Sequence, residues 1–139
     1  MNKSKLSESL QDYLETIYIV LQTKPVCRIK DIEQLMDVTK PSIVQAVNIL
    51  KDRDMINKKK YGYITLTKKG EEVASNLYNK HETLRNFIEM MFDVNDKQAD
   101  TLACEIEHHL TDKMTARMKI INANLRKNPE LINSLTGEI

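Results

Sequence analysis

Apolar residues recur every three or four positions along most of the chain, which is the period of an amphipathic helix. The first such run covers residues 6–22, and Thr23-Lys24-Pro25 ends it because proline donates no backbone hydrogen bond. Two shorter helices are predicted, one at residues 29–36 with Ile32 and Leu35 pointing inward and one at residues 40–54. Only a brief turn separates these two helices, and Pro41 suits the first turn of the second one. Such a pair of helices is typical of a helix-turn-helix.

The pattern changes from helical to alternating at residues 56–67. Ile64 and Leu66 alternate with Tyr63, Thr65 and Thr67, and Gly62 lies near the expected turn. We predict two short strands there, forming a hairpin. A further short strand is expected at residues 26–28, with Cys27 as a small buried hydrophobe. A hairpin directly after a helix-turn-helix predicts a winged helix.

Helical periodicity returns after residue 70 and continues to the end of the sequence. We predict a long helix over residues 71–91, a second helix carrying Ala99, Leu102, Ala103, Ile106 and Leu110 on one face, a third around Met114 to Leu125, and a tail helix from Pro129 to Leu135. The predicted fold class is therefore mainly α. A winged helix-turn-helix domain occupies residues 1–70, and an all-helical domain occupies residues 71–139.

Charge divides the chain in the same place. Residues 1–70 contain 13 basic and 8 acidic residues, a balance of +5, whereas residues 71–139 contain 8 basic and 12 acidic residues, a balance of −4. A basic first half indicates a polyanionic partner. The two cysteines lie far apart, there is no signal peptide, and no apolar run approaches the ~20 residues of a membrane span. We therefore expect a cytoplasmic protein with reduced thiols and no membrane association.

Two groups of polar residues in the first half are candidates for contact with DNA. Residues early in the second helix would face base edges in the major groove. The basic hairpin would contact phosphates, although a charged loop that only improves solubility is the alternative reading. The candidates are Thr39, Lys40, Pro41, Ser42 and Gln45 in the helix and Lys58, Lys59, Lys60 and Tyr61 in the wing.

A different constellation occurs in the second half. Cys104, Glu107 and His108 have i, i+3 and i+4 spacing, which places a thiol, a carboxylate and an imidazole on one helical face. These groups suit a divalent transition metal, and His109 would point away. The alternative is a solvated acidic helix with surface histidines. Asp12 and Glu15 likewise share a face of the first helix, where an ordinary solvated face is again the alternative.

A winged helix followed by His81 and the pattern C-x-x-E-H resembles the diphtheria-toxin-repressor family of metal-dependent regulators. The resemblance is strongest to the short branch of manganese-transport regulators and covers nearly the whole chain. Its anchors are Asp12-Tyr13-Leu14-Glu15-Thr16-Ile17-Tyr18, Pro41-Ser42-Ile43-Val44-Gln45, Leu66-Thr67-Lys68-Lys69-Gly70, His81-Glu82 and Glu107-His108-His109.

The resemblance implies a homodimer that represses metal-uptake genes from a palindromic operator in double-stranded DNA. One or two divalent ions per subunit would bind between the first helix and the dimerisation helices and activate DNA binding. The implied ligands are Asp12, Glu15, His81, Cys104, Glu107 and His108. Apolar residues after position 71 would form the dimer interface or the core beside it; these are Leu84, Ile88, Met91, Phe92 and Leu102.

Four features depart from the family pattern. The manganese branch usually has glutamate in place of Cys104, and the iron branch usually has methionine in place of Asp12. We therefore expect both Mn²⁺ and Fe²⁺ to activate the protein. Arg85 stands where iron-type relatives place a ligating glutamate, and the sequence lacks the length for the SH3-like domain of larger relatives. Both features argue against the ancillary site of those relatives.

Two other functions remain as alternatives: a winged-helix regulator that senses no metal and a di-iron carboxylate protein. The second requires two E-x-x-H pairs on different helices, whereas Glu105 and His108 supply one. No nucleophile triad, phosphate-binding loop or dinucleotide fingerprint is present. We expect neither catalytic residues nor an organic small-molecule substrate.

Overall fold

The computed structural model describes residues 5–137 and divides into two compact units. The division falls between Asn76 and Leu77, inside the long helix α4 (Lys68–Phe92). Helices make up most of the structure, and a single two-stranded sheet is found among the described residues. The predicted fold class, mainly α with a winged helix-turn-helix followed by a helical region, is confirmed.

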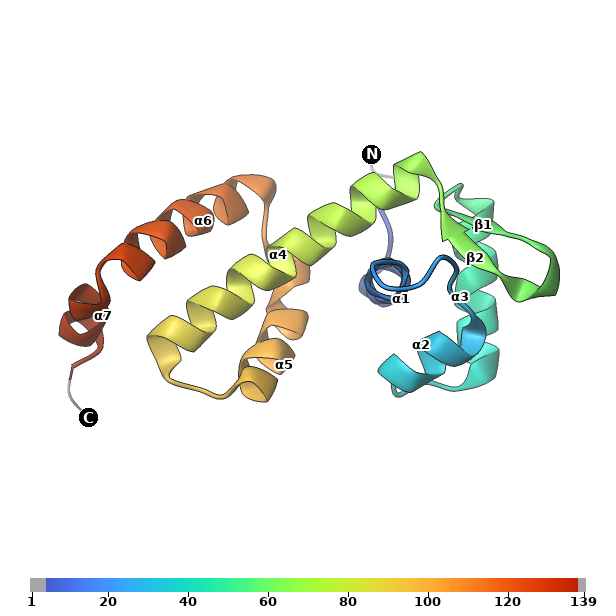
Figure 1. Ribbon diagram of the computed structural model, residues 1–139. Coiled ribbons are helices and arrows are strands. Elements are labelled where there is room, and N and C mark those ends of the chain that lie inside the picture. The colour runs from blue at the N-terminus through green and yellow to red at the C-terminus, as the bar shows by residue number, and fades with distance from the viewer. Residues whose placement is uncertain (1–4, 138–139) are drawn as a thin grey trace. The chain divides into compact units, whose positions relative to one another are not determined.

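The first unit contains α1 (Glu8–Leu21), α2 (Ile29–Leu35), α3 (Lys40–Asp52) and the hairpin, followed by the start of α4 (Figure 1). Side chains that satisfy free backbone amides define where the helices begin. The Ser7 hydroxyl accepts a hydrogen bond from the Leu10 amide, and the Thr39 hydroxyl accepts one from the Ser42 amide. Pro41 lies in the first turn of α3, as predicted.

The hairpin pairs β1 (Ile56–Lys58) with β2 (Ile64–Leu66) in antiparallel register, so that Lys58 is opposite Ile64. The short 3-10 helix η1 (Lys60–Gly62) forms its tip. Gly62 has φ +72 there, as its predicted place in the turn requires, and Tyr61 adopts φ +67. The expected strand at residues 26–28 is reduced to one β-bridge between Cys27 and Ile64.

The hydrophobic core of the first unit joins α1, α2, α3, the hairpin and α4. Cys27 is fully buried in it, as predicted, and burial raises the pKa of its thiol to about 12. The remaining buried members are Leu6, Leu10, Tyr13, Leu14, Ile17, Val20, Ile32, Ile43, Ala46, Val47, Leu50, Met55, Ile56, Ile64 and Ala74. The expectation that Leu35 points inward is wrong: this side chain, the last of α2, is 58% exposed.

Gly70 allows α4 to begin close to the preceding chain. A Cβ atom at this position would lie 1.8 Å from the Met55 carbonyl oxygen, which leaves no space for a side chain. The Thr67 hydroxyl accepts a hydrogen bond from the Gly70 amide and donates to the carbonyl of Asp54. These contacts join the hairpin to α4.

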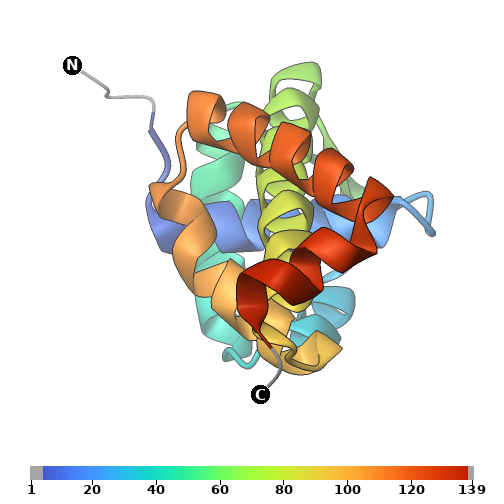
Figure 2. The same ribbon diagram turned by 90° about the vertical axis from the view of Figure 1, so that its left-hand side faces the viewer.

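The second unit consists of the rest of α4 with α5 (Asp96–Ile106), the 3-10 helix η2 (Glu107–His109), α6 (Asp112–Lys127) and α7 (Pro129–Thr136). Figure 2 shows α6 and α7 following one another, with the chain bending between them. The tail helix was predicted over nearly the same residues. The core here is small: Leu84 and Ile88 of α4 pack with Ala99 and Ala103 of α5.

The helix predicted to continue to Leu110 ends instead at Ile106, where η2 begins. The predicted apolar face is only partly correct. Leu102 is 37% exposed and Ile106 is 41% exposed, whereas Ala99 and Ala103 are fully buried. Small side chains allow two helices to approach closely, so the alanines form the contact with α4.

No helix in the described part of the chain is both long enough and apolar enough to cross a membrane.

Candidate functional site

Glu107 lies at the centre of the polar cluster in the second unit. Its side chain is fully buried, and its Oε2 atom lies 2.9 Å from Nδ1 of His81 in a hydrogen bond. Oε1 lies 3.8 Å from Nε2 of His108. Two imidazoles therefore flank one buried carboxylate, and His81 and His108 were both predicted to act with Glu107.

The Oε1 atom of Glu107 is buried and accepts no hydrogen bond within the described residues. A buried carboxylate oxygen without a donor is unfavourable, and a nearby cation removes that cost. A carboxylate between two imidazoles is a donor set that suits divalent transition metals. The residues present therefore fit the metal ion that the sequence pattern predicted.

The break in the helix after Ile106 determines how Glu107 enters the cluster. The Glu107 carbonyl accepts a hydrogen bond from the Leu110 amide at 3.1 Å, which closes the 3-10 turn. Lys80 of α4 donates to the Leu110 carbonyl at 3.0 Å and forms an ion pair with Asp112 at 3.1 Å. Lys80 thus anchors the end of this turn beside His81. No motif or periodicity in the sequence pointed to Lys80.

Cys104 does not share the environment of Glu107. Its side chain is exposed, whereas Glu107 is buried. The prediction that both side chains lie on one face assumed that the α-helix continues through Glu107. The 3-10 helix η2 begins there instead, so the angular spacing of an α-helix does not apply. The assignment of Cys104 as a ligand stays a prediction.

The other two predicted ligands, Asp12 and Glu15, belong to the first unit. Both lie on α1 at the predicted i, i+3 spacing; Glu15 is buried and Asp12 is half-buried. The solvated-face alternative therefore does not describe Glu15. Neighbouring residues of α1, among them Leu14 and Ile17, belong to the same core as Ile43 of α3.

Arg85, one turn after His81, forms ion pairs along α4. Its guanidinium lies 3.0 Å from a Glu82 carboxylate oxygen and 2.9 Å from one of Glu89. The hydrogen bond with Glu82 is the largest cause that raises the pKa of Arg85, and the charge of Asp100 is among the smaller causes. Arg85, the cation that departs from the expected glutamate, is therefore held in ion pairs within α4.

The candidate DNA-contact residues of α3 are all exposed. One face of the helix is buried through Ile43, Ala46, Val47 and Leu50. Its first turns present the predicted residues to solvent: Thr39, Lys40, Pro41, Ser42 and Gln45. The Thr39 hydroxyl also lies 2.8 Å from the Ser42 hydroxyl. The hydroxyl group of Thr39 therefore already interacts with a neighbouring residue of the protein.

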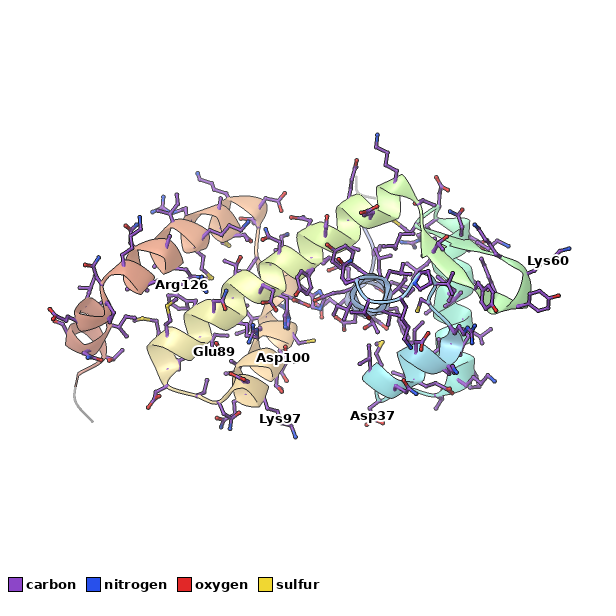
Figure 3. All side chains as sticks on the ribbon, viewed as in Figure 1. Asp37, Lys60, Glu89, Lys97, Asp100 and Arg126 are labelled. Atoms are coloured by element: carbon purple, nitrogen blue, oxygen red, sulfur yellow. The ribbon has the colours of Figure 1, made fainter. Side chains whose placement is uncertain are left out.

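The residues of the wing that were predicted to contact DNA are also exposed to solvent. Lys58, Lys59, Lys60 and Tyr61 are exposed, Tyr61 to 90%. Figure 3 shows Lys60 extending from the tip of the hairpin. Behind the tip, the guanidinium of Arg28 lies 4.8 Å from the ring centroid of Tyr63 and donates a hydrogen bond to its hydroxyl. Arg28 adds a positive charge that the sequence analysis did not assign to this surface.

Comparison with known proteins identifies both halves of the chain. Residues 5–64 match the family model of the iron-dependent repressor N-terminal DNA-binding domain, and residues 67–133 match that of the iron-dependent repressor metal-binding and dimerisation domain. A helix-turn-helix-type transcriptional regulator of Methanocaldococcus jannaschii is 31% identical over 117 residues, which cover 83% of this chain and 93% of that protein. The chain belongs to the iron-dependent repressor family.

Further relatives agree with this family of metal-dependent transcriptional regulators. The helix-turn-helix-type transcriptional regulator MntR of Lysinibacillus sphaericus is 29% identical over 127 residues, covering 91% of each chain. Among solved structures, the manganese regulator SloR superposes with a TM-score of 0.71 at 30% identity, covering 81% of this chain and 53% of that chain. This family member therefore spans about half the length of that solved structure. The resemblance drawn from the sequence is confirmed.

Proposed function

We propose that this chain is a metal-activated repressor that binds a palindromic operator in double-stranded DNA as a homodimer and controls metal-uptake genes. Its cofactor would be Mn²⁺ or Fe²⁺, its location the cytoplasm, and it would have no enzymatic activity and no organic substrate. The observation that carries this proposal is the buried carboxylate of Glu107, flanked by His81 and His108 and accepting no hydrogen bond at Oε1 within the described chain. Matches to a DNA-binding and a metal-binding family domain support it.

Six residues are the proposed ligands, drawn from both halves of the sequence. Asp12, Glu107 and His108, with Cys104 through its sulfur or its backbone carbonyl, would form one site. Glu15 and His81, sharing Glu107, would form a second site beside it. One or two ions per subunit would then bind. When bound, the ion supplies positive charge that compensates the gathered carboxylates.

The residues of the first unit suggest how binding at α1 would reach the DNA-binding surface. α1 carries Asp12 and Glu15, and its opposite side packs through Leu14 and Ile17 into the core that holds α3. Any restraint on α1 is therefore passed to the recognition helix through rigid packing. We propose that ligation of Asp12 and Glu15 fixes the separation of the two recognition helices in the dimer.

Base reading is proposed for the exposed start of α3. Pro41 and the methyl group of Thr39 would contact thymine methyls, and Gln45 would reach adenine. Lys40 and Ser42 would contribute from the same turn. Lys58, Lys59, Lys60 and Tyr61 would hold the DNA backbone. We also propose that the DNA-binding domain ends at residue 70 and that the metal-binding and dimerisation domain begins at residue 71.

The decisive experiment is operator binding by metal-stripped protein, titrated anaerobically with Mn²⁺ and Fe²⁺ in parallel. Wild-type protein should respond to both ions. Cys104→Glu should shift the preference toward Mn²⁺, because a carboxylate replaces a thiol, and Asp12→Met should shift it toward Fe²⁺. Identical metal profiles in all three proteins would remove the ligand assignment at both positions. DNA binding that never depends on metal would favour a winged-helix regulator without metal sensing.

Dimer formation has a separate test. The second unit exposes Phe92 to 60% and Leu102 to 37%, and both are proposed interface residues. Met91 is half-buried, while Leu84 and Ile88 lie in the core of the second unit. Sedimentation at micromolar concentration should show a dimer, and replacing Phe92 and Leu102 by glutamate should shift it toward monomer. Monomer alone, with and without metal, would contradict the proposal.

A further inference from the structure

A second carboxylate holds His81 from the side opposite Glu107. The Oδ1 atom of Asp100 lies 2.6 Å from Nε2 of His81, while Nδ1 of the same ring lies 2.9 Å from Oε2 of Glu107. Both ring nitrogens are therefore engaged by carboxylates. No motif in the sequence pointed to Asp100, which is labelled in Figure 3 near the facing helices α4 and α5.

The packing of α5 against α4 produces this arrangement. Asp100 follows the buried Ala99, and Glu107 comes seven positions later, beyond the buried Ala103. Both alanines pack against Leu84 and Ile88, which lie three and seven residues after His81 on α4. These contacts hold α5 against α4, and the imidazole of His81 lies between the two carboxylates.

We propose that Asp100 is a positioning residue for His81, accepting a hydrogen bond from Nε2–H so that Nδ1 is held toward Glu107 for metal binding. This inference rests on the proposed metal-binding function. An imidazole that binds metal through one nitrogen commonly donates its other N–H to a carboxylate. That hydrogen bond fixes the ring orientation and would hold the remaining ring proton on Nε2 when the metal ion takes the place of the proton between Nδ1 and Glu107.

Two observations separate this role from that of a metal ligand. The bonded oxygen of Asp100 is at Nε2, across the ring from the nitrogen that faces Glu107. In addition, the charge of Asp100 acts on a protein cation, because it is among the smaller causes that raise the pKa of Arg85. Asp100 is 63% exposed in its side chain, so its replacement leaves the core intact.

The test compares Asp100→Ala and Asp100→Asn with wild type in the full-length protein. Mn²⁺ affinity and stoichiometry are measured by calorimetry, and ¹⁵N NMR of the metal-free protein reports the protonation of each His81 nitrogen. Asp100→Ala should weaken Mn²⁺ binding about 10- to 100-fold without changing the stoichiometry. It should also change the His81 ring signals before any metal is added.

The conservative variant distinguishes position from charge. Asparagine keeps an oxygen acceptor but loses the negative charge, so Asp100→Asn should retain affinity within about 10-fold of wild type. The matched control is Glu105→Gln, which removes an exposed carboxylate from the same helix. If Asp100→Asn bound Mn²⁺ as weakly as Asp100→Ala, the negative charge of Asp100 would explain the loss of affinity, and the positioning of His81 would not.

Other outcomes are equally specific. Unchanged affinity and unchanged His81 signals in Asp100→Ala would overturn the inference while leaving the proposed function intact. Loss of a whole equivalent of Mn²⁺ would overturn it in favour of Asp100 as a ligand. Failure of the wild-type protein itself to bind Mn²⁺ or Fe²⁺ would overturn the proposed function, and the inference with it.

Discussion

The two units of this protein bury very different kinds of residue. The core of the first unit is formed by apolar side chains from three helices, the hairpin and the start of α4. Over the residues described, the second unit buries six apolar residues and five polar ones. The apolar ones are Leu77, Leu84, Ile88, Ala99, Ala103 and Leu125, and the polar ones are His81, Thr83, Glu107, Thr115 and Asn122. Apolar burial is the main source of folding free energy. The second unit therefore has fewer such contacts of its own.

Exposed apolar residues follow the same division. The second unit exposes more large hydrophobic side chains than the first: Phe92, Leu102, Ile106, Met114, Ile120, Ile121, Leu131 and Leu135. Apolar surface on this scale marks an interaction site, which agrees with the match to a dimerisation domain. The difference teaches that the first unit is stabilised mainly by its own apolar core, whereas the second combines a smaller apolar core with a larger exposed apolar surface.

The largest expected effect concerns the surface of the first unit. Replacing Lys58, Lys59 and Lys60 together by alanine should lower DNA affinity roughly 100-fold per subunit near physiological salt, because three phosphate contacts are lost. Operator and random DNA should be affected alike, and the salt dependence should flatten. Fluorescence anisotropy over a salt series measures both.

The control for the wing replaces three exposed lysines of the second unit, Lys97, Lys113 and Lys119, by alanine. It removes the same charge from the protein and should leave the salt slope close to that of wild type. An equal slope in the wing variant and the control would contradict the assignment of the wing as a DNA-contact surface.

The next effect tests how tightly the first unit is packed. Gly70→Ala should lower the free energy of unfolding by about 3 kcal/mol, since its Cβ would meet the Met55 carbonyl at 1.8 Å. Gly62→Ala should cost only about 1 kcal/mol, because φ is +72 but no atom lies within 4 Å. Urea denaturation of both variants gives the comparison. Equal losses of unfolding free energy in the two variants would mean that the backbone near Met55 moves easily to make room for the added Cβ.

Metal should stabilise the two units unequally. Saturation at about 100 times the dissociation constant adds about 2.7 kcal/mol to a folded state that alone binds the ion. We expect increased hydrogen-exchange protection in α1, α5 and the second half of α4, which carry the proposed ligands, with little change in α2 and the hairpin. Mass spectrometry of metal-free and Mn²⁺-loaded protein resolves the segments. An equal gain in hydrogen-exchange protection across both units would contradict the expected difference between them.

The smallest effect is a pH dependence within the first unit. Asp31 is buried and accepts hydrogen bonds from Lys24 Nζ at 2.6 Å and from the Arg28 amide at 2.8 Å. The bond with Lys24 is the largest cause that lowers the pKa of this carboxyl below its ordinary 3.8. Asp31→Asn should therefore reduce stability at neutral pH by about 1–2 kcal/mol.

The sign of the pH effect follows from the lowered pKa. The stabilisation by Asp31 is complete above pH 3.8 and is lost as the pH falls through the lower value of the folded protein. Thermal melting of wild type and Asp31→Asn should thus converge in strong acid. Asp37→Asn, which changes an exposed carboxylate of the same unit, is the matched control. A constant difference between wild type and Asp31→Asn at every pH would exclude this ionisation as the cause.

The sequence by itself determined the elements whose signals are local. Helix period, the proline in the first turn of α3, the alternation around Ile64 and the glycine at the hairpin tip all act within a few residues. The winged helix-turn-helix followed from them, and so did the pairing of Glu107 with His108. The family membership followed from motifs that are likewise short.

Only the tertiary structure decided which residues meet across helices. It ended α5 at Ile106, where Lys80 holds the following turn, and so buried Glu107 while leaving Cys104 exposed. It exposed Leu35, which its helical position had assigned to the core. It brought Asp100 to His81, 19 residues away in the sequence. Periodicity along one helix carries no information about the side chain that a neighbouring helix places opposite it, because that contact depends on how the two helices pack.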